Sequence, residues 1–308
     1  MITGVCLNPC IDKTVHIERF EYGGMNRIRS SRIDGGGKGI HIALGAQKLQ
    51  MQSLAIGLIY EANRHLVTDR LDAAGVPYRF VSAPGEIRTN LKIFDEEKGV
   101  VTEVNEAGPQ VSEERLLSLR QLSSEAARES RAMVFTGSLP PGAPNDFYQT
   151  LIEEAGSCAF RVLDAEGERL RAGLLARPEL IKPNSYELET LTRKKLSSLD
   201  DLRLAAVHSI GMGAGLCCVT MGSGGALLTD GKRCVYAPSV EVPVRSTVGA
   251  GDSVVCGLLY ALLGGADLAE ALRTGVAAGT AAVMSEGTQL FDRAGFEEML
   301  KRVKIQEL

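Results

Sequence analysis

The sequence has 308 residues, of which 44% are hydrophobic, and its formal net charge is −4. This length and apolar content predict an ordered α/β chain with a sizeable core and argue against disorder. The lysines and arginines are dispersed, so we expect no nucleic-acid partner. The longest apolar helix candidate, Val254 to Leu263, is too short to span a bilayer, so we expect no membrane partner.

Seven cysteines occur without a CxxC pair or a Cys/His cluster. We therefore expect reduced thiols and no zinc site. The N-terminal run MITGVCLNP enters a strand-like segment directly and has no signal-peptide pattern. These features together predict a cytoplasmic protein.

Short apolar runs alternate with helical patterns along the chain. The runs predict strands at Gly4–Leu7, Leu54–Leu58, Ala132–Phe135, Phe160–Leu163, Leu180–Ile181, Leu216–Thr220 and Ala226–Thr229. Helices are expected at about 38–49, 64–74, 113–127, 146–155, 201–211, 251–263 and 267–284. This alternation predicts a mostly parallel sheet with helices on both faces, which binds ligands at the carboxyl ends of its strands.

Two polar segments, about 14–33 and 86–104, interrupt this alternation. The second predicts a hairpin with one apolar face and one polar face. The polar face carries Arg88, Asn90 and Lys92. Such a hairpin is either a solvated surface element or a small sheet laid over a site, with Arg88 facing an anion. No repeat or linker divides the chain, so we expect residues 1–308 to form a single domain with these two segments as a lid.

Two glycine-rich stretches precede helical patterns. Asp34–Gly39, read as DGGGKG, lacks the spacing of a Walker A loop. Ser246–Ser253, read as STVGAGDS, places Asp252 at the start of an apolar helix. The carboxylate is either a helix cap worth about 1 kcal/mol, or it faces the group that attacks an anion held by the glycine backbone. Val254 replaces the third glycine of a GxGxxG motif, which argues against a dinucleotide-dependent oxidoreductase.

Three further motifs follow predicted strands. Thr136–Gly142, read as TGSLPPG, predicts a fixed loop at a strand end. In Lys182–Leu188, read as KPNSYEL, Asn184 and Glu187 either cap a helix or hold a water-coordinated magnesium ion. Thr220–Gly225, read as TMGSGG, predicts either a plain hairpin turn or a backbone surface against which a nucleotide lies.

Taken in order, LNPCID, GGGKGI, TGSLPPG, KPNSYEL, TMGSGGAL and STVGAGDS resemble the ribokinase-like (PfkB) carbohydrate kinases from Leu7 to about Thr288. The early Asn-Pro-x-x-Asp, the Gly-x-x-Asn-Arg of Gly23–Arg27 and Gly-Ser-Leu-Pro-Pro-Gly are most similar to the 1-phosphofructokinase and tagatose-6-phosphate kinase branch. The resemblance implies a three-layer ribokinase-like sandwich with a small β-sheet lid. It also implies ATP and Mg²⁺ as cofactors and a homodimer formed through the lid.

The resemblance also implies roles for individual residues. Asp252 would be the general base, with the amides of Gly249, Ala250 and Gly251 forming an anion hole. Contacts to the sugar phosphate would come from Asp12, Arg27, Gly36, Gly37, Lys38, Arg88 and Ser138. The nucleotide would contact Lys182, Asn184, Thr220, Gly222, Val248, Val276 and Gly279, and Asn184 and Glu187 would hold the metal through water.

One position departs from the family pattern. His41 stands where the family's glycine loop continues as Gly-Ile-Asn with an Asn on the sugar. We expect His41 to contact the sugar and to tune binding through its charge state, or else to pack within the first turn of its helix. The expected reaction is ATP-dependent conversion of fructose 1-phosphate to fructose 1,6-bisphosphate. The alternatives are a tagatose-6-phosphate kinase and a non-catalytic sugar-phosphate sensor of the same fold.

Overall fold

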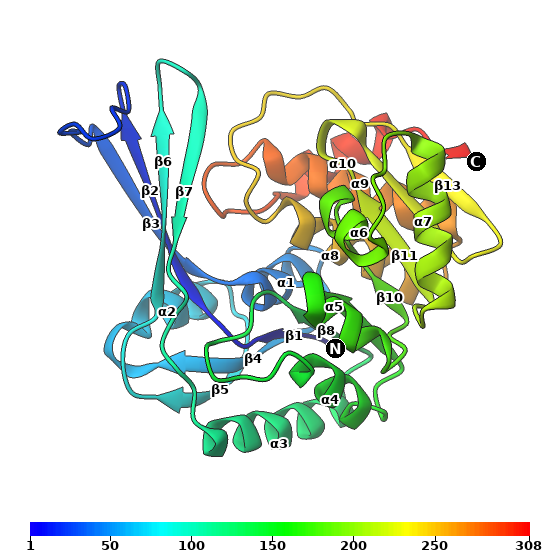
Figure 1. Ribbon diagram of the computed structural model, residues 1–308, viewed down its shortest axis with the longest axis horizontal. Coiled ribbons are helices and arrows are strands. Elements are labelled where there is room, and N and C mark those ends of the chain that lie inside the picture. The colour runs from blue at the N-terminus through cyan, green and yellow to red at the C-terminus, as the bar shows by residue number, and fades with distance from the viewer.

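The computed structural model describes all 308 residues and contains two sheets (Figure 1). Seven strands of the large sheet are parallel, from β5 to β11 in spatial order, and three antiparallel strands complete one edge. The spatial order is β14 (Gln306–Glu307), β13 (Cys234–Ala237), β12 (Ala226–Thr229), β11 (Leu216–Thr220), β10 (Leu180–Ile181), β9 (Phe160–Asp164), β8 (Ala132–Thr136), β1 (Ile2–Cys6), β4 (Ser53–Tyr60) and β5 (Tyr78–Ala83).

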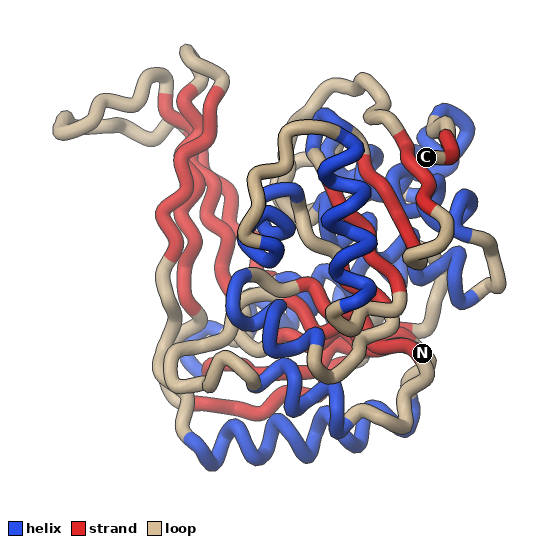
Figure 2. Tube along the Cα trace, turned by 45° about the vertical axis from the view of Figure 1, so that its right-hand side comes forward, coloured by secondary structure: helices blue, strands red, loops and turns tan.

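Helices cover both faces of this sheet, which makes the three layers expected from the sequence (Figures 1 and 2). One group is α1 (Lys38–Lys48), α2 (His65–Ala73), α8 (Ala250–Leu263), α9 (Leu268–Val283) and α10 (Arg293–Arg302). The other is α3 (Glu113–Glu129), α4 (Phe147–Glu154), α5 (Gly167–Leu174), α6 (Ser185–Thr192) and α7 (Leu199–Gly211). Every predicted strand and helix is present, and β5, β13, β14, α5 and α10 are additional.

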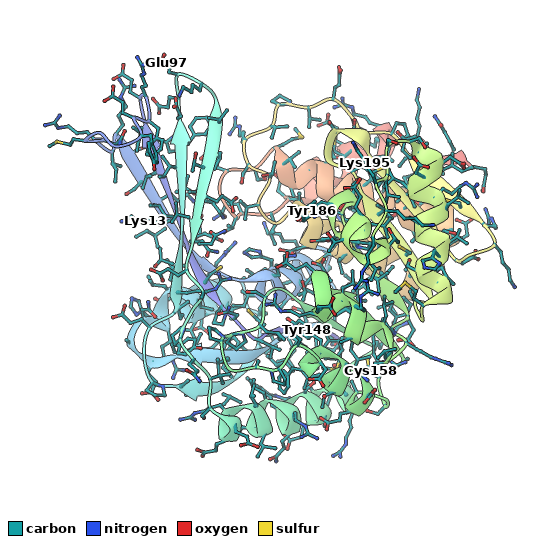
Figure 3. The ribbon with its side chains drawn as sticks, viewed as in Figure 1. Lys13, Glu97, Tyr148, Cys158, Tyr186 and Lys195 are labelled. Carbon is teal, nitrogen blue, oxygen red and sulfur yellow. The ribbon has the colours of Figure 1, made fainter.

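A small four-stranded sheet stands away from the large one. Its order is β3 (Ser30–Gly36), β2 (Cys10–Ile17), β6 (Arg88–Asp95) and β7 (Val100–Asn105), with antiparallel outer pairs joined by the parallel pair β2–β6. Figure 3 labels Lys13 along this sheet and Glu97 in the turn at its tip. We call this sheet the lid. Its first segment is longer than the expected 14–33, because Cys10 and Ile11 already pair with Arg88 and Thr89.

The predicted glycine loop is largely a strand. Asp34, Gly35 and Gly36 belong to β3, and only Gly37 separates that strand from α1. A Cβ on Gly35 would lie 2.0 Å from the carbonyl oxygen of Leu66, so β3 approaches α2 too closely for a side chain. Gly37 has φ +134°, a value that favours glycine, and is the N-cap of α1. These glycines bring the N-terminus of α1 directly beneath the lid.

One core of 78 buried residues runs through the large sheet and its helices, and a second core of three, Val15, Ile17 and Ile93, lies on the lid. All seven cysteines are free and buried. No helix combines the length and apolar character needed to cross a bilayer. The carboxyl ends of the parallel strands face the lid, and a site between them is therefore enclosed from two sides.

Candidate active site

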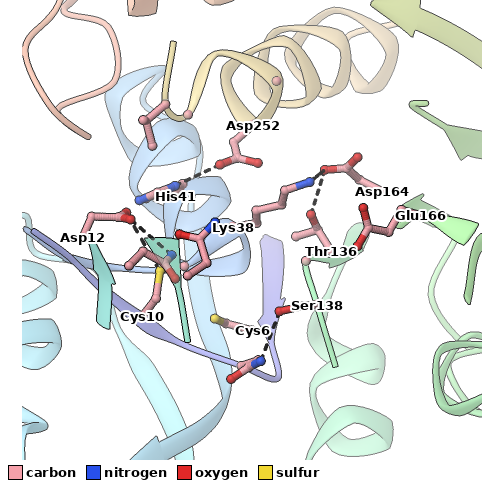
Figure 4. A pocket seen from close by; sticks show the side chains of 18 of the residues that line it. Cys6, Cys10, Asp12, Lys38, His41, Thr136, Ser138, Asp164, Glu166 and Asp252 are labelled. Carbon is pink, nitrogen blue, oxygen red and sulfur yellow. Dashed lines mark hydrogen bonds and ion pairs between the residues drawn. The ribbon is translucent and has the colours of Figure 1, made fainter. Parts of the chain in front are cut away.

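A cleft of about 620 Å³ lies between the lid and the large sheet, and Figure 4 shows it from close by. Only four of its 27 lining residues are hydrophobic, and the lining brings together residues from the end of β1 to the start of α8. The predicted residues that line it are Asp12, Gly37, Lys38, His41, Arg88, Ser138, Lys182, Asn184, Glu187, Thr220, Val248, Gly249, Gly251 and Asp252. Most of the predicted site thus forms one continuous surface.

The remaining predicted residues lie elsewhere. Arg27 is exposed in the loop between β2 and β3, and Gly222 lies in a short turn after β11. Val276 and Gly279 lie on α9, where a Cβ on Gly279 would be 2.6 Å from Cγ2 of Val254. That glycine allows α9 to pack closely against α8. Gly36 and Ala250 lie next to lining residues without lining the cleft themselves.

The N-terminus of α8 opens into the cleft. Gly249 is its N-cap with φ +77°, and a Cβ there would lie 2.5 Å from Cδ2 of Leu290. The backbone N–H groups of Gly251 and Asp252 find no acceptor in the protein. The ammonium of Lys182 lies 3.3 Å from the point where a Cβ of Gly251 would be. Free N–H groups, the helix dipole and this ammonium together make a site for an anion.

Asp252 lies in the first turn of α8 but does not cap it. The helix has no side-chain cap hydrogen bond, so the capping alternative for Asp252 is wrong. The side chain is 5% exposed and lines the cleft. Its carboxylate accepts one hydrogen bond, from Nδ1 of His41 at 2.9 Å (Figure 4). The carboxylate is thus positioned for a ligand rather than for its own helix.

Two lysines meet at one buried carboxylate. Asp164 Oδ2 lies 3.2 Å from Nζ of Lys38, and Asp164 Oδ1 lies 3.1 Å from Nζ of Lys182. Thr136 also donates a hydrogen bond to Oδ2, at 2.9 Å. Burial alone would raise the pKa of Asp164, but the two ammonium groups hold that pKa well below its usual range. Asp164 in turn raises the pKa of Lys38. The acid fixes both cations at the centre of the cleft.

Asp164 was missed in the sequence, although a signal was present. It follows the predicted strand Phe160–Leu163 directly, and ligand-binding side chains in this architecture follow strand ends. Cys6, Thr136 and Glu166 line the cleft from equivalent strand ends. The rule that ligands bind at the carboxyl ends of parallel strands would also have identified these residues.

Asn184 and Glu187 form a capping box at the start of α6. Asn184 Oδ1 accepts from the Glu187 N–H, and Glu187 Oε2 accepts from the Asn184 N–H, both at 2.8 Å. The capping alternative is therefore confirmed for this pair, and it leaves one Glu187 oxygen without a partner in the box. Burial raises the pKa of Glu187, and the charge of Lys182 partly offsets that rise. A cation near this oxygen would favour the charged carboxylate.

The lid contributes the opposite wall. Lys92 donates to Asp12 Oδ1 at 2.8 Å, and both side chains are buried. The Arg88 guanidinium donates to Asn90 Oδ1 at 3.0 Å and to Ser138 Oγ at 3.4 Å. The polar face predicted for the hairpin thus lines the cleft, and its apolar face points away. The surface-hairpin alternative is wrong for this face.

A cleft with fixed cations, an open helix N-terminus and a carboxylate between its walls has the parts that phosphoryl transfer requires: positioned charge rather than a covalent nucleophile. The site therefore defines a phosphotransferase. The chain matches the pfkB family carbohydrate kinase over residues 5–293 and belongs to that family.

Curated relatives and solved structures agree with this membership. The chain is 35% identical to the 1-phosphofructokinase of Rhodobacter capsulatus, with 100% of this chain and 98% of the relative covered. It is 33% identical to the ATP-dependent 6-phosphofructokinase isozyme 2 of Escherichia coli, covering 92% and 93%. The crystal structure of phosphofructokinase-2 from Escherichia coli in complex with substrates and products superposes with a TM-score of 0.91, at 30% identity and 98% coverage of both chains.

Proposed function

We propose that the protein transfers the γ-phosphoryl group of ATP to the 6-hydroxyl of fructose 1-phosphate. The observation that carries this proposal is the arrangement of two walls across one cleft. Arg88 on the lid suits the phosphate already on the sugar, and Asp252 with the N-terminus of α8 suits the hydroxyl that reacts. A substrate with a phosphate at one end and a hydroxyl at the other fits both walls.

In the proposed reaction, the sugar hydroxyl gives its proton to the Asp252 carboxylate. Its oxygen bonds to the γ-phosphorus as the bond from that phosphorus to the β–γ bridging oxygen breaks, and ADP leaves. The N–H groups of Gly251 and Asp252 would donate to the transferring group. Lys182 would neutralise the nucleotide phosphates. Lys38, which the resemblance places at the sugar phosphate, shares the Asp164 carboxylate with Lys182, so we assign it to the nucleotide phosphates as well.

The cleft suits a magnesium ion that binds mainly through phosphates and water. No group of three or more His, Cys, Asp or Glu side chains is arranged to hold a metal, so a site made of protein alone is not indicated. Mg²⁺ in kinase sites usually keeps several waters and takes one or two carboxylates plus substrate phosphates. Glu187 and Asn184 would contribute through water, and Asp164 faces the same part of the cleft. The ion would supply charge neutralisation on the phosphates.

An assay of ADP release from ATP tests this function. Fructose 1-phosphate should give the highest kcat/KM among four acceptors, the others being fructose 6-phosphate, tagatose 6-phosphate and unphosphorylated fructose. The fructose 6-phosphate arm covers the activity named for the Escherichia coli relative. Faster turnover with either 6-phosphate would change the substrate and keep the reaction class. No ADP release with any acceptor would favour the sugar-phosphate sensor.

The Asp252→Asn variant tests the base. Asn has nearly the same shape and can accept the His41 hydrogen bond through its amide oxygen, but it cannot take the proton. We expect turnover to fall by roughly 10²-fold or more, with folding unchanged. Near-normal turnover would remove Asp252 from the proposed mechanism.

We also propose that the lid pairs two copies of the chain. The face turned away from the cleft is mostly apolar: Ile33 is 53% and Val104 is 56% exposed on it, and Lys13 lies between them in the strand register. Burying such residues against a second lid would remove apolar surface from water at both edges. Sedimentation of the protein and of lid variants tests this pairing.

A further inference from the structure

We propose that His41 is a positioning residue for Asp252: its Nδ1–H holds the carboxylate in the orientation in which it accepts the substrate proton. This inference rests on the proposed role of Asp252 as the base. It gives His41 a different task from the sugar contact that the resemblance implies.

The contact between the two side chains is direct and buried. Nδ1 of His41 lies 2.9 Å from Oδ2 of Asp252, and the two side chains are 4% and 5% exposed. An ionised carboxylate only accepts hydrogen bonds, so Nδ1 carries the hydrogen in this pair. No other group in the protein donates a hydrogen bond to this carboxylate. Without His41, no hydrogen bond from the protein would fix the rotation of the Asp252 carboxylate.

The other ring nitrogen faces protein, not the open cleft. Nε2 is buried and has no hydrogen-bond partner. A Cβ on Gly36 would lie 2.7 Å from it, so the ring occupies the space that this glycine leaves. The end of β3 therefore covers this nitrogen on the Gly36 side. This geometry favours action through Asp252 over direct binding of the sugar.

The helices that carry the pair are packed tightly together. His41 lies in the first turn of α1 and Asp252 in the first turn of α8, and these two helices are in contact. Cys256, one turn further along α8, donates its thiol hydrogen to the Ile42 carbonyl at 3.4 Å. A Cβ on Gly45 would lie 2.7 Å from the Cys256 sulfur, so only glycine permits this approach. A hydrogen bond between such rigid supports can set the angle of a carboxylate.

Replacement of His41 separates this role from binding. His41→Leu replaces the imidazole with an apolar side chain that has no donor, and it should lower kcat about 10- to 100-fold while changing KM for sugar phosphate and ATP less than about threefold. His41→Asn places an amide N–H near the position of Nδ1 and should restore most of kcat. His41→Gln sets its amide further out and should not restore it. His208→Leu, on the exposed side of α7, is the matched control and should behave as wild type.

A double-mutant cycle distinguishes the possible failures. In the Asp252→Asn background, His41→Leu should lower the residual rate by less than about threefold, because its target no longer acts as a base. If Asp252→Asn itself retains turnover, the proposed base is wrong. If Asp252→Asn is inactive and His41→Leu remains fully active, or raises KM for the sugar alone, only the positioning role is wrong.

A measurement on the folded protein does not depend on activity. The Nδ1-bound proton of His41 should give a slowly exchanging downfield resonance in the NMR spectrum, assigned by its absence in His41→Asn. Asp252→Ala should shift or remove this resonance, and His208→Leu should leave it in place. An unchanged resonance in Asp252→Ala would overturn the inference even if His41→Leu failed to fold.

Discussion

At the scale of the residue, Arg88 is an anion contact that is already oriented. Its guanidinium donates to Asn90 Oδ1, to the Glu106 carbonyl and to Ser138 Oγ, which fixes its plane before a ligand arrives. A preoriented fork loses less entropy on binding phosphate than a free side chain does. The three hydrogen bonds therefore favour phosphate binding by Arg88, because they hold its guanidinium in place before the ligand binds.

Arg88→Ala should raise KM for the sugar phosphate about 10- to 100-fold, which corresponds to the roughly 1.5–3 kcal/mol of a charged hydrogen bond. KM for ATP should change little, since the nucleotide is expected beside Lys182 on the other wall. Arg88→Lys should recover only part of the loss, because an ammonium lacks the fork. Steady-state kinetics with each substrate varied in turn checks the prediction. A rise confined to KM for ATP would contradict it.

Asp164 makes stability depend on pH in a defined direction. Its pKa is depressed in the folded protein, so the folded state keeps the carboxylate charged at acidities that protonate it in the unfolded chain. The stabilisation is present above the ordinary Asp pKa of about 3.9 and is lost as pH falls below that value toward the folded pKa. Near neutral pH the stabilisation from the ion pairs of Asp164 with Lys38 and Lys182 is therefore fully present.

Asp164→Asn should lower the free energy of unfolding at pH 7 by about 3–5 kcal/mol, because Lys182 stays buried without its partner. The difference in the free energy of unfolding between the variant and wild type should narrow as the pH falls from about 4 to about 3. Urea unfolding of both proteins at pH 7 and at about pH 3 measures this difference. Asp200→Asn, at a carboxylate whose side chain is 68% exposed, is the control and should change little. A gap that is the same at both pH values would rule out the charge as its source.

At the scale of the element, apolar runs that are buried on both faces were predictable, as in Ser53–Tyr60, where all eight residues are buried. β5 escaped prediction because five of its six residues are only partly buried or exposed, so its sequence, YRFVSA, has no continuous apolar run. Pairing with β4 in the sheet decides its structure.

The candidate site also has a part that the sequence predicts and a part that it does not. The motifs at strand ends predicted most of the cleft wall, because chain direction places those ends along one edge. The bond between His41 and Asp252 joins residues that are 211 positions apart, and no local pattern reports it. The contact follows from the packing of α1 on α8, which only the three-dimensional structure contains.

The outer face of the lid yields a prediction about assembly. Val104→Lys should shift the protein toward a smaller species in sedimentation velocity, because a charge at this exposed apolar position cannot be buried against a second lid without a partner. Leu204→Lys is matched in exposure, 53% against 56%, but lies on α7, and it should leave the assembly unchanged. Equal effects of the two substitutions would remove the lid as the pairing surface.

At the scale of the whole molecule, β1 lies inside the ten-stranded sheet, third from the edge that β5 forms, although it is the first strand to be made. It pairs with β4 on one side and with β8 on the other. Its second edge therefore has no partner until residue 136 has been synthesised. At roughly 5–20 residues per second, that interval is on the order of ten seconds.

During synthesis, therefore, the apolar strand β1 has an unpaired edge for this interval. Unpaired strand edges are the sites where intermolecular strand pairing begins. We expect the nascent chain to need shielding by a chaperone over this interval, and the amides of β1 and β8 to become protected in the same step of refolding. Pulse-labelling hydrogen exchange measures that order. Protection of β1 well before β8 would show that pairing with β4 alone protects the N-terminal strand, and the free edge would then need no shielding while β8 is awaited.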